Sequence, residues 1–236
     1  MELNDTTINI LKNYATINPN IVINEGNQVK TISVARNVLS TSEVSVEFPQ
    51  TFGIYDLNEF LSVLSLVDQP RLRFEKEYVV VGEATGRSSV KYFFSDPEML
   101  TTPANSINMP EPEVKFTLDS DTLKKVKRAA AALGHDEISI TPVTGAIRLS
   151  VLDSKDATSN NYSIDVEGSY PDVKFQFILN VGNLKVVNED FEVGISSKLI
   201  SKFTSKQSTT EYDIALEKTS TSVVLPSFIE NLQRPS

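Results

Sequence analysis

Hydrophobic and polar residues alternate with a period of two along most of the chain. The segments with this pattern are 44–48, 137–141, 147–151, 162–166, 173–179, 191–195 and 212–216. A strict period of two is typical of strands that have one buried face and one face in water. Antiparallel sheets that are covered on one side produce this pattern. We therefore predict a protein dominated by antiparallel sheet.

Four segments have helical spacing instead. In the clearest one, 120–133, apolar residues recur every three or four positions, Asp119 or Ser120 can cap the start, and Gly134 can end the helix. Further helices are expected at about 6–15, after Tyr55, and, as a shorter element, at 182–187. Helices that alternate with runs of antiparallel strands indicate an α+β fold.

The order of elements occurs twice, because in each half a helix is followed by strands, a second helix and more strands. The halves meet in a stretch that contains Pro103, Pro110 and Pro112 and has little periodicity, which is typical of an extended linker. We predict an N-terminal domain over 1–102, a linker over 103–113, a C-terminal domain over 114–218 and a tail over 219–236. The two domains are similarly built.

Composition excludes several kinds of chemistry. The 236 residues include no cysteine and one histidine, His135, so a thiolate site, a disulfide framework and a multi-histidine metal centre are excluded. The segment 82–89 is interpreted as a hairpin loop and not as a phosphate-binding loop. We expect no catalytic residue, no metal and no cofactor. Because the chain lacks a secretory signal and a membrane span, it is expected to be soluble and intracellular.

The charge is unevenly distributed. Net charge is −9, from 22 Lys and Arg against 31 Asp and Glu, yet cations gather on the predicted helices. These residues are Lys12, Lys124, Lys125, Lys127, Arg128 and Lys185. Such a pattern commonly marks only a solvated helix face. The alternative is a surface that attracts the phosphates of a nucleic acid.

Two blocks of sequence resemble a known family. The residues 5–7, 11–13 and 15–18, together with 54–58, 60–61 and 64–67, resemble the sliding clamps of T-even-type bacteriophages. Weaker similarity follows in the same order at 138–141, 177–180, 183–185 and 215–217. The likeness extends over most of residues 3–218.

This resemblance implies both a fold and a function. Family members have two similar domains of antiparallel sheet with two helices each, and they assemble as a homotrimeric ring of six domains. The ring encircles double-stranded DNA and tethers the phage DNA polymerase. An ATP-driven clamp loader places it on DNA, and family members also take part in late transcription. They catalyse no reaction. The resemblance implies no membrane partner and points to the cytoplasm of an infected bacterial host.

The resemblance also suggests which residues act. Helices line the hole of the ring, so all six basic residues would face DNA; Lys12, Arg128 and Lys185 align with basic family positions, and the others follow from helical geometry. Partners of clamps present a short apolar peptide to a pocket near the linker. The residues that we propose for this pocket are Ile107, Met109 and Pro110. In the tail, Leu225, Phe228 and Ile229 could imitate such a peptide, or the tail could be a free end.

Ring assembly needs unpaired strand edges at both ends of the sheet system. We expect such edges at 88–94 in the first domain and at 199–204 in the second. The main rival hypothesis is a virion structural or assembly protein with two β-rich domains, which would need no basic helix face. An enzyme with a shallow carboxylate site is a more distant alternative.

Overall fold

The predicted antiparallel strands form four sheets in a computed structural model that describes residues 1–83, 85–103, 108–156 and 158–222. The first half of the chain contains α1 (Asp5–Ile17), β1 (Ile21–Ile23), β2 (Gly26–Ile32), β3 (Val38–Phe48), β4 (Phe52–Ile54), α2 (Leu57–Ser65), β5 (Arg71–Phe74), β6 (Tyr78–Gly82), β7 (Ser89–Phe93) and the 3-10 helix η1 (Pro97–Met99).

The second half contains α3 and most of the remaining strands. Its elements are β8 (Val114–Leu118), α3 (Ser120–Leu133), β9 (Glu137–Val143), β10 (Ala146–Leu152), β11 (Tyr162–Val166), β12 (Gly168–Ser169), β13 (Phe175–Asn180), the 3-10 helix η2 (Val181–Asn183), β14 (Phe191–Ser196), β15 (Ile200–Ser205), β16 (Glu211–Ala215) and β17 (Thr221–Ser222). The α+β fold class is confirmed, with all strand pairs antiparallel among the described residues.

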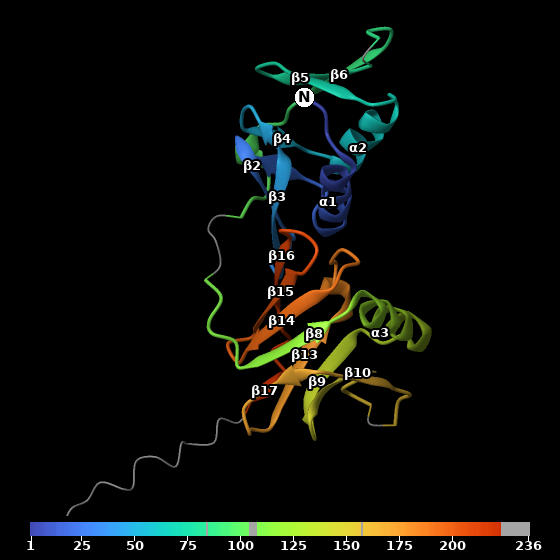
Figure 1. Cartoon of the computed structure of the whole chain (residues 1–236), viewed down its shortest axis with the longest axis vertical. Helices are drawn as coiled ribbons and strands as arrows, with labels where there is room; N and C mark the ends of the chain where they lie inside the picture. Colours follow the sequence, from blue (N-terminus) through green and yellow to red (C-terminus); the bar gives the residue numbers. More distant parts are fainter. Residues whose placement is uncertain (84, 104–107, 157, 223–236) are drawn as a thin grey trace, which may run out of the picture.

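One sheet joins the two halves of the chain. Its seven strands are ordered β12-β8-β14-β15-β16-β3-β2, so β3 from the first half pairs with β16 from the second (Figure 1). In the register of this pair, Ser40 lies opposite Tyr212. The other sheets are β11-β10-β9-β13-β17, β5-β6-β7 and β1-β4. The backbone hydrogen bonds therefore run without a break across the junction of the halves.

The three α-helices begin where the sequence indicates, because each has a side-chain cap. Asn4 Oδ1 accepts a hydrogen bond of 2.8 Å from Thr7 N at the start of α1. Asp56 caps α2 and Asp119 caps α3. Gly134 ends α3 with φ of 69°, a left-handed conformation that costs little for glycine.

Helices α1 and α3 lie on the same side of the seven-stranded sheet, with α1 above α3 in Figure 1. Tyr14 of α1 contacts Ser42 of β3, with 2.8 Å between the hydroxyl oxygens. Leu123 of α3 is buried beside Phe203 of β15. Phe203 lies opposite Tyr212, and Tyr212 lies opposite Ser40 on the next strand. These three inward-facing positions therefore form one row across the sheet. The opposite face of the sheet carries no α-helix of the described chain.

Two predictions are wrong. The helix expected at 182–187 is the short 3-10 helix η2, followed by chain without regular secondary structure. Leu184 and Val186 are buried while Lys185 between them is exposed, so the period is two and not 3.6. The segment 199–204 is not an edge strand either, because β15 is bonded to β14 on one side and β16 on the other.

Other predictions have mixed outcomes. The hairpin around 82–89 is confirmed, and β7 is an edge strand as expected. Thr221 and Ser222, within the predicted tail, form β17, which pairs with β13. Leu225, Phe228, Ile229 and Ile107 lie outside the described residues. No helix of the described chain is long and apolar enough to cross a membrane.

Candidate nucleic-acid interface

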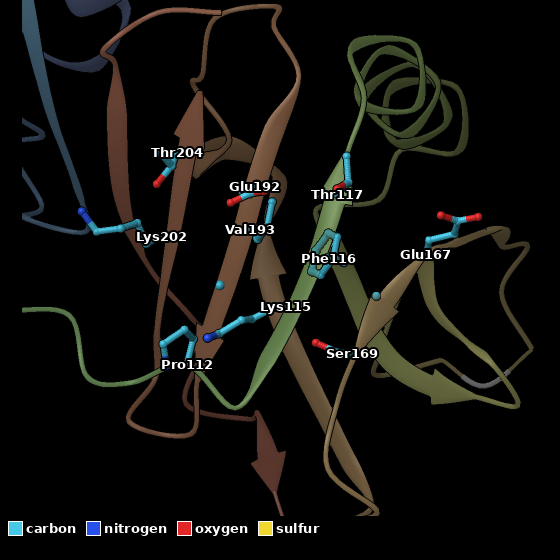
Figure 2. Close-up of a pocket in the computed structure, with 12 residues that line it drawn as sticks. Pro112, Lys115, Phe116, Thr117, Glu167, Ser169, Glu192, Val193, Lys202 and Thr204 are labelled. Carbon is cyan, nitrogen blue, oxygen red and sulfur yellow. The ribbon is translucent and has the colours of Figure 1, made fainter. Parts of the chain in front are cut away.

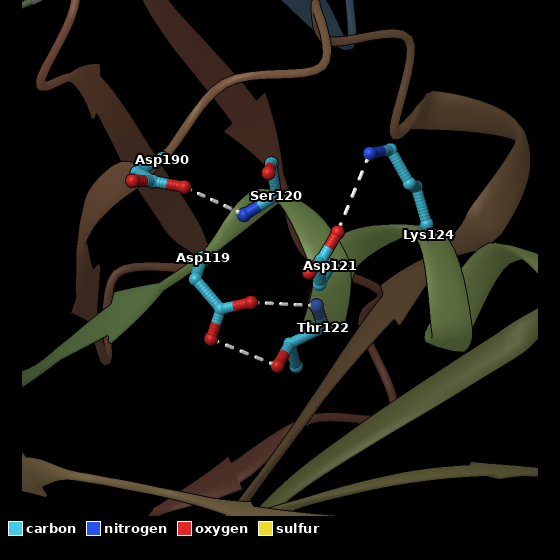
Figure 3. A network of polar contacts seen from close by, with 6 residues as sticks. All are labelled: Asp119, Ser120, Asp121, Thr122, Lys124 and Asp190. Atoms are coloured by element: carbon cyan, nitrogen blue, oxygen red, sulfur yellow. Dashed lines mark hydrogen bonds and ion pairs between the residues drawn. The ribbon is translucent and has the colours of Figure 1, made fainter.

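The start of α3 is held in place by two carboxylates (Figure 3). Asp119 Oδ1 accepts a hydrogen bond of 2.7 Å from Thr122 N, and its Oδ2 accepts one of 3.0 Å from the Thr122 hydroxyl. The bond from Thr122 N is the main reason that the pKa of Asp119 lies below its usual value. Asp190, from the turn before β14, accepts from Ser120 N at 2.7 Å. The helix that carries most of the predicted cations is therefore fixed to its own half.

The cations of α3 differ in their surroundings. Lys125 and Arg128 are exposed, as is Lys124, whose Nζ lies 3.4 Å from Asp121 Oδ1. Lys127 is half-buried, and its Nζ donates a hydrogen bond of 3.4 Å to the carbonyl oxygen of Val186. Burial lowers the pKa of Lys127. The hydrogen bond of Lys127 thus restrains the segment around Val186, while the other three cations of α3 are exposed to solvent.

The segment 185–187 connects α3 to α1. Asn13 Nδ2, on α1, donates a hydrogen bond of 3.0 Å to the Lys185 carbonyl oxygen. The Tyr212 hydroxyl donates to Asn13 Oδ1 at 2.8 Å and accepts from Val187 N at 3.2 Å. Asn13, from the first half, is therefore hydrogen-bonded to the same segment, 185–187, that Lys127 contacts in the second half. Lys12, which precedes Asn13 on α1, and Lys185 are both exposed.

Buried hydroxyl groups lie under α1 and were not identified from the sequence. Tyr14 Oη accepts a hydrogen bond of 3.1 Å from Ser40 Oγ and contacts Ser42 Oγ, which in turn donates to Thr210 Oγ1 at 2.9 Å. Burial raises the pKa of Tyr14 to about 12. A further link between the halves is the bond of 2.9 Å from Asn37 Nδ2 to Asn183 Oδ1. These groups fix α1 against strands from both halves.

Cations on both faces of the molecule include paired and unpaired side chains. On the sheet face away from the helices, Lys202 lies 2.6 Å from Glu211, Lys115 lies 2.8 Å from Glu111, and Lys206 lies 3.8 Å from Glu192. On the helical side, four cations form no ion pair with any described residue. These are Lys12, Lys125, Arg128 and Lys185.

Helix α2 is different from α1 and α3. It carries Glu59 and no cation, as its sequence indicates. Glu59 is close to the Tyr92 hydroxyl, at 3.4 Å, and burial raises the pKa of Tyr92 to about 12. Among the three α-helices, cations without an ion pair therefore occur on α1 and α3 and not on α2.

The sheet face away from the helices has a cavity of about 530 Å³ (Figure 2). Its lining comes from β8, β12, β14 and β15, with Pro112 from the end of the predicted linker. Met109 and Pro110, proposed for the partner-peptide pocket, are half-buried in the linker and do not line this cavity. A smaller cavity of about 220 Å³ lies at the junction of the halves and includes Leu39 and Ile200. No cluster of three or more metal-binding side chains occurs in the described ranges.

A two-part antiparallel fold with unpaired cations on its helical side is the architecture of a DNA clamp, and comparison with known proteins agrees. Residues 4–92 match the family model for DNA polymerase processivity factor, and residues 115–218 match the one for gp45 sliding clamp, C terminal. The sliding clamp of Vibrio phage KVP40 is 32% identical over 222 residues, with 92% of this chain and 99% of the relative covered. That of Escherichia phage RB69 is 31% identical, with 94% and 99% covered.

Solved structures of more distant proteins share the fold. PCNA from Thermococcus kodakaraensis superimposes with a TM-score of 0.68 at 17% identity, covering 91% of this chain and 98% of the other. PCNA from A. fulgidus, solved with the C-terminal region of FEN-1 bound, gives 0.67 at 13% identity, covering 89% and 94%. The chain belongs to the sliding-clamp family, the DNA polymerase processivity factors of T4-like bacteriophages.

Proposed function

We propose that this protein encircles double-stranded DNA and holds the phage DNA polymerase on it. The observation that carries the proposal is the set of unpaired cations on the helical side, in a chain of net charge −9. Phosphates carry the same charge in every sequence, so exposed Lys and Arg can bind DNA without choosing a site. Negative charge on the outer surface repels DNA, so the helical side is the surface on which DNA binding is most favourable.

The ring is proposed to be a homotrimer closed by edge strands. β7 is an edge of the three-stranded sheet, and β11 is an edge of the five-stranded sheet in the other half. Pairing β7 of one protomer with β11 of the next would satisfy both edges and continue the outer wall. Such an interface would cover Phe93, whose exposed fraction is 61%.

The ring assembly has a direct test. Light scattering over a concentration series is expected to give a mass near three protomers of 26.1 kDa each. Phe93→Asp should lower this mass toward one protomer, because it places a charge in the interface. Met99→Asp is the matched control, since Met99 is 84% exposed and lies outside β7. A monomer at every concentration, or equal effects of both variants, would count against this interface.

The proposal extends to partners. An ATP-driven clamp loader opens the ring and places it on DNA, and the clamp takes part in late transcription, all in the cytoplasm of an infected bacterium. The clamp itself catalyses no reaction. A partner peptide, such as one from the polymerase, is proposed to bind beside linker residues Met109 and Pro110, with Ile107, and to use the cavity at the junction of the halves, where Leu39 and Ile200 lie among polar residues. The PCNA from A. fulgidus supports this idea by analogy, since that clamp binds the C-terminal region of FEN-1.

Charge reversal tests the DNA-facing surface. The triple variant Lys124→Glu, Lys125→Glu, Arg128→Glu should abolish loader-dependent processive synthesis while the oligomeric mass stays unchanged. Lys127 is left out because it is half-buried. The matched control reverses Lys115, Lys198 and Lys206, which are exposed residues of the second half outside α3. Equal loss in both triple variants would refute the assignment of the DNA-facing surface. A virion structural protein, the alternative, would show no DNA phenotype in either.

A further inference from the structure

Strand β7 has a free edge, and its hairpin with β6 shows which residues direct their backbone groups toward that edge. At one end of the hairpin, Phe94 N donates a hydrogen bond of 3.0 Å to the Glu77 carbonyl oxygen. At the other end, Glu83 N donates one of 3.3 Å to the Ser88 carbonyl oxygen. In an antiparallel pair, bonded and non-bonded positions alternate, so the even-numbered residues of β7 bond to β6. The N–H and C=O groups that point to the free edge belong to Ser89, Lys91 and Phe93.

The free edge of β11 follows from Pro142 in the same way. Pro142 lies opposite Ile147 in the pairing of β9 with β10, and because it has no N–H, the two residues cannot form a bonded pair. Ile147 therefore directs its N–H and C=O groups toward β11, where it lies opposite Val166. By the same alternation, the even-numbered residues of β11 bond to β10. The odd-numbered ones, Ser163 and Asp165, direct their backbone groups to the free edge.

Side-chain burial follows the same division on both strands. On β7 the residues with backbone groups at the free edge are exposed, and the two residues between them are half-buried. On β11 Ser163 and Asp165 are exposed, whereas their neighbours are buried or half-buried. Strands that share a sheet with one covered face keep exposed residues opposite exposed residues. If β7 of one copy pairs with β11 of another, Lys91 can therefore lie opposite Ser163, Asp165 or Glu167.

Two of these three positions are less favourable for Lys91. Glu167 is excluded, because its carbonyl oxygen already accepts a hydrogen bond of 3.4 Å from Thr117 N, and the chain after it pairs with β8. Opposite Ser163, Lys91 would have a hydroxyl group as its direct neighbour and Asp165 only on the diagonal, about 7–8 Å away. Opposite Asp165, it faces a carboxylate directly, and opposite charges in that position stabilise a sheet.

Lys91 and Asp165 are both suited to such a contact. The Nζ atom of Lys91 lies 3.9 Å from the centroid of the Tyr78 ring. Lys91 is exposed and forms no ion pair with any described residue. Asp165 accepts hydrogen bonds of 2.7 and 2.9 Å from Arg148, and these bonds lower the pKa of Asp165. The Asp165 carboxylate is thus charged, and each of its oxygens keeps a second lone pair for a further donor.

We propose that copies of this chain join with Lys91 of one protomer opposite Asp165 of the next, and that these two residues and Arg148 set the register of the two edge strands. The proposal rests on the ring assembly proposed above and adds the residues that align it. In this register, Phe93 lies opposite Ser163 of the next protomer. The interface joins different ends of the molecule, since β6, the neighbour of β7, and β10, the neighbour of β11, lie far apart in Figure 1. Each copy can therefore bind one neighbour at each end.

Cysteine pairing tests the register, because the chain has no natural cysteine. The test variant carries Phe93→Cys with Ser163→Cys, whose Cα atoms would lie about 5.5 Å apart across the interface, within reach of a disulfide. The matched control carries Phe93→Cys with Asn161→Cys, an exposed pair that a shift of two residues would bring together. After mild oxidation, the test variant should run as a covalent trimer on a denaturing gel, while the control stays monomeric. Neither Phe93→Cys nor Ser163→Cys alone should form a disulfide, because different residues of neighbouring copies meet.

Charge reversal tests the role of Lys91 separately, with light scattering as the readout. Lys91→Glu should raise the protein concentration at which half of the chains are trimeric by at least about tenfold, because repulsion replaces attraction at every interface. Arg73→Glu is the matched control and should leave this concentration unchanged. Arg73 is exposed and lies in the same cross-strand row as Lys91, on the opposite edge of the sheet.

The outcomes separate the register from the assembly itself. Trimers in which the control cysteine pair couples as readily as the test pair would overturn the register and leave the ring assembly standing. Equal effects of Lys91→Glu and Arg73→Glu on trimer formation would overturn the role of the charges. A monomer at every concentration would overturn both the register and the assembly on which it rests.

Discussion

Lys127 is predicted to differ from Lys125 in its effect on DNA binding, although the two residues are two positions apart on α3. Lys127 is half-buried and donates to the Val186 carbonyl oxygen at 3.4 Å. Lys125 is exposed and pairs with no described carboxylate. Lys127→Met and Lys125→Met remove the same charge and keep a similar aliphatic stem. We expect only the second variant to remove a phosphate contact.

The magnitude follows from counterion release. Each phosphate contact contributes about 0.9 to the slope of log affinity against log salt. Between 50 and 200 mM salt, one contact therefore accounts for about a 3.5-fold loss of affinity. Lys125→Met should flatten the slope by about 0.9 for each protomer whose Lys125 touches DNA. Lys127→Met should leave the slope unchanged and destabilise the protein by about 1 kcal/mol or less, because its hydrogen bond is long and partly solvated.

The assay is fluorescence anisotropy of a labelled duplex titrated with each variant at several salt concentrations. Urea unfolding, measured in parallel, separates a loss of fold from a loss of contact. Equal flattening by both variants would refute the assignment of Lys127 to a positioning role. No flattening by Lys125→Met would refute its role as a phosphate contact.

Three predictions concern stability and are measured by urea or thermal unfolding. Asp119→Ala should cost about 1 kcal/mol through loss of the α3 cap, whereas Asp121→Ala should change stability by less than about 0.5 kcal/mol; equal effects would contradict the capping argument. Stability should fall as pH rises from about 10 to about 12, because the unfolded chain loses the Tyr14 proton first, and Tyr14→Phe should flatten this fall. Gly168→Ala should lower the free energy of unfolding by about 1–3 kcal/mol, since a Cβ there would lie 2.6 Å from the Lys115 carbonyl oxygen. An unchanged unfolding midpoint would contradict this steric argument.

Local signals in the sequence were sufficient for much of the fold. The cap at Asp119, and Gly134 after α3, predicted where that helix begins and ends. The period of two identified strands such as β10 and β14. These features depend on residues close in the chain, which is why they can be read without a structure.

Features set by distant residues could not be predicted in the same way. Alternation in 199–204 indicates a strand but not whether both of its edges are bonded, and β15 proved to be internal. In 182–187 the spacing of Leu184 and Val187 fits a helix, but Val186 is buried too, and the chain after η2 has no regular secondary structure. The bonds from Asn13 and Lys127 to this segment join residues that are far apart in sequence.

The candidate site shows the same division. Helical geometry identified Lys124, Lys125 and Arg128 as exposed residues, which the structure confirms. It did not reveal that Lys127 is half-buried, because the covering carbonyl oxygen belongs to Val186. The role of all six residues toward DNA remains a prediction that the variants above test.

Retention on circular DNA tests the central claim most directly. The labelled protein is loaded onto a nicked circle by an ATP-driven clamp loader, free protein is removed by gel filtration, and half of the sample is cut once with a restriction enzyme. Encirclement predicts that the protein stays on the intact circle and is lost from the linear molecule by sliding off its ends. Equal loss from both, or equal retention on both, would contradict a topological link and with it the proposed function.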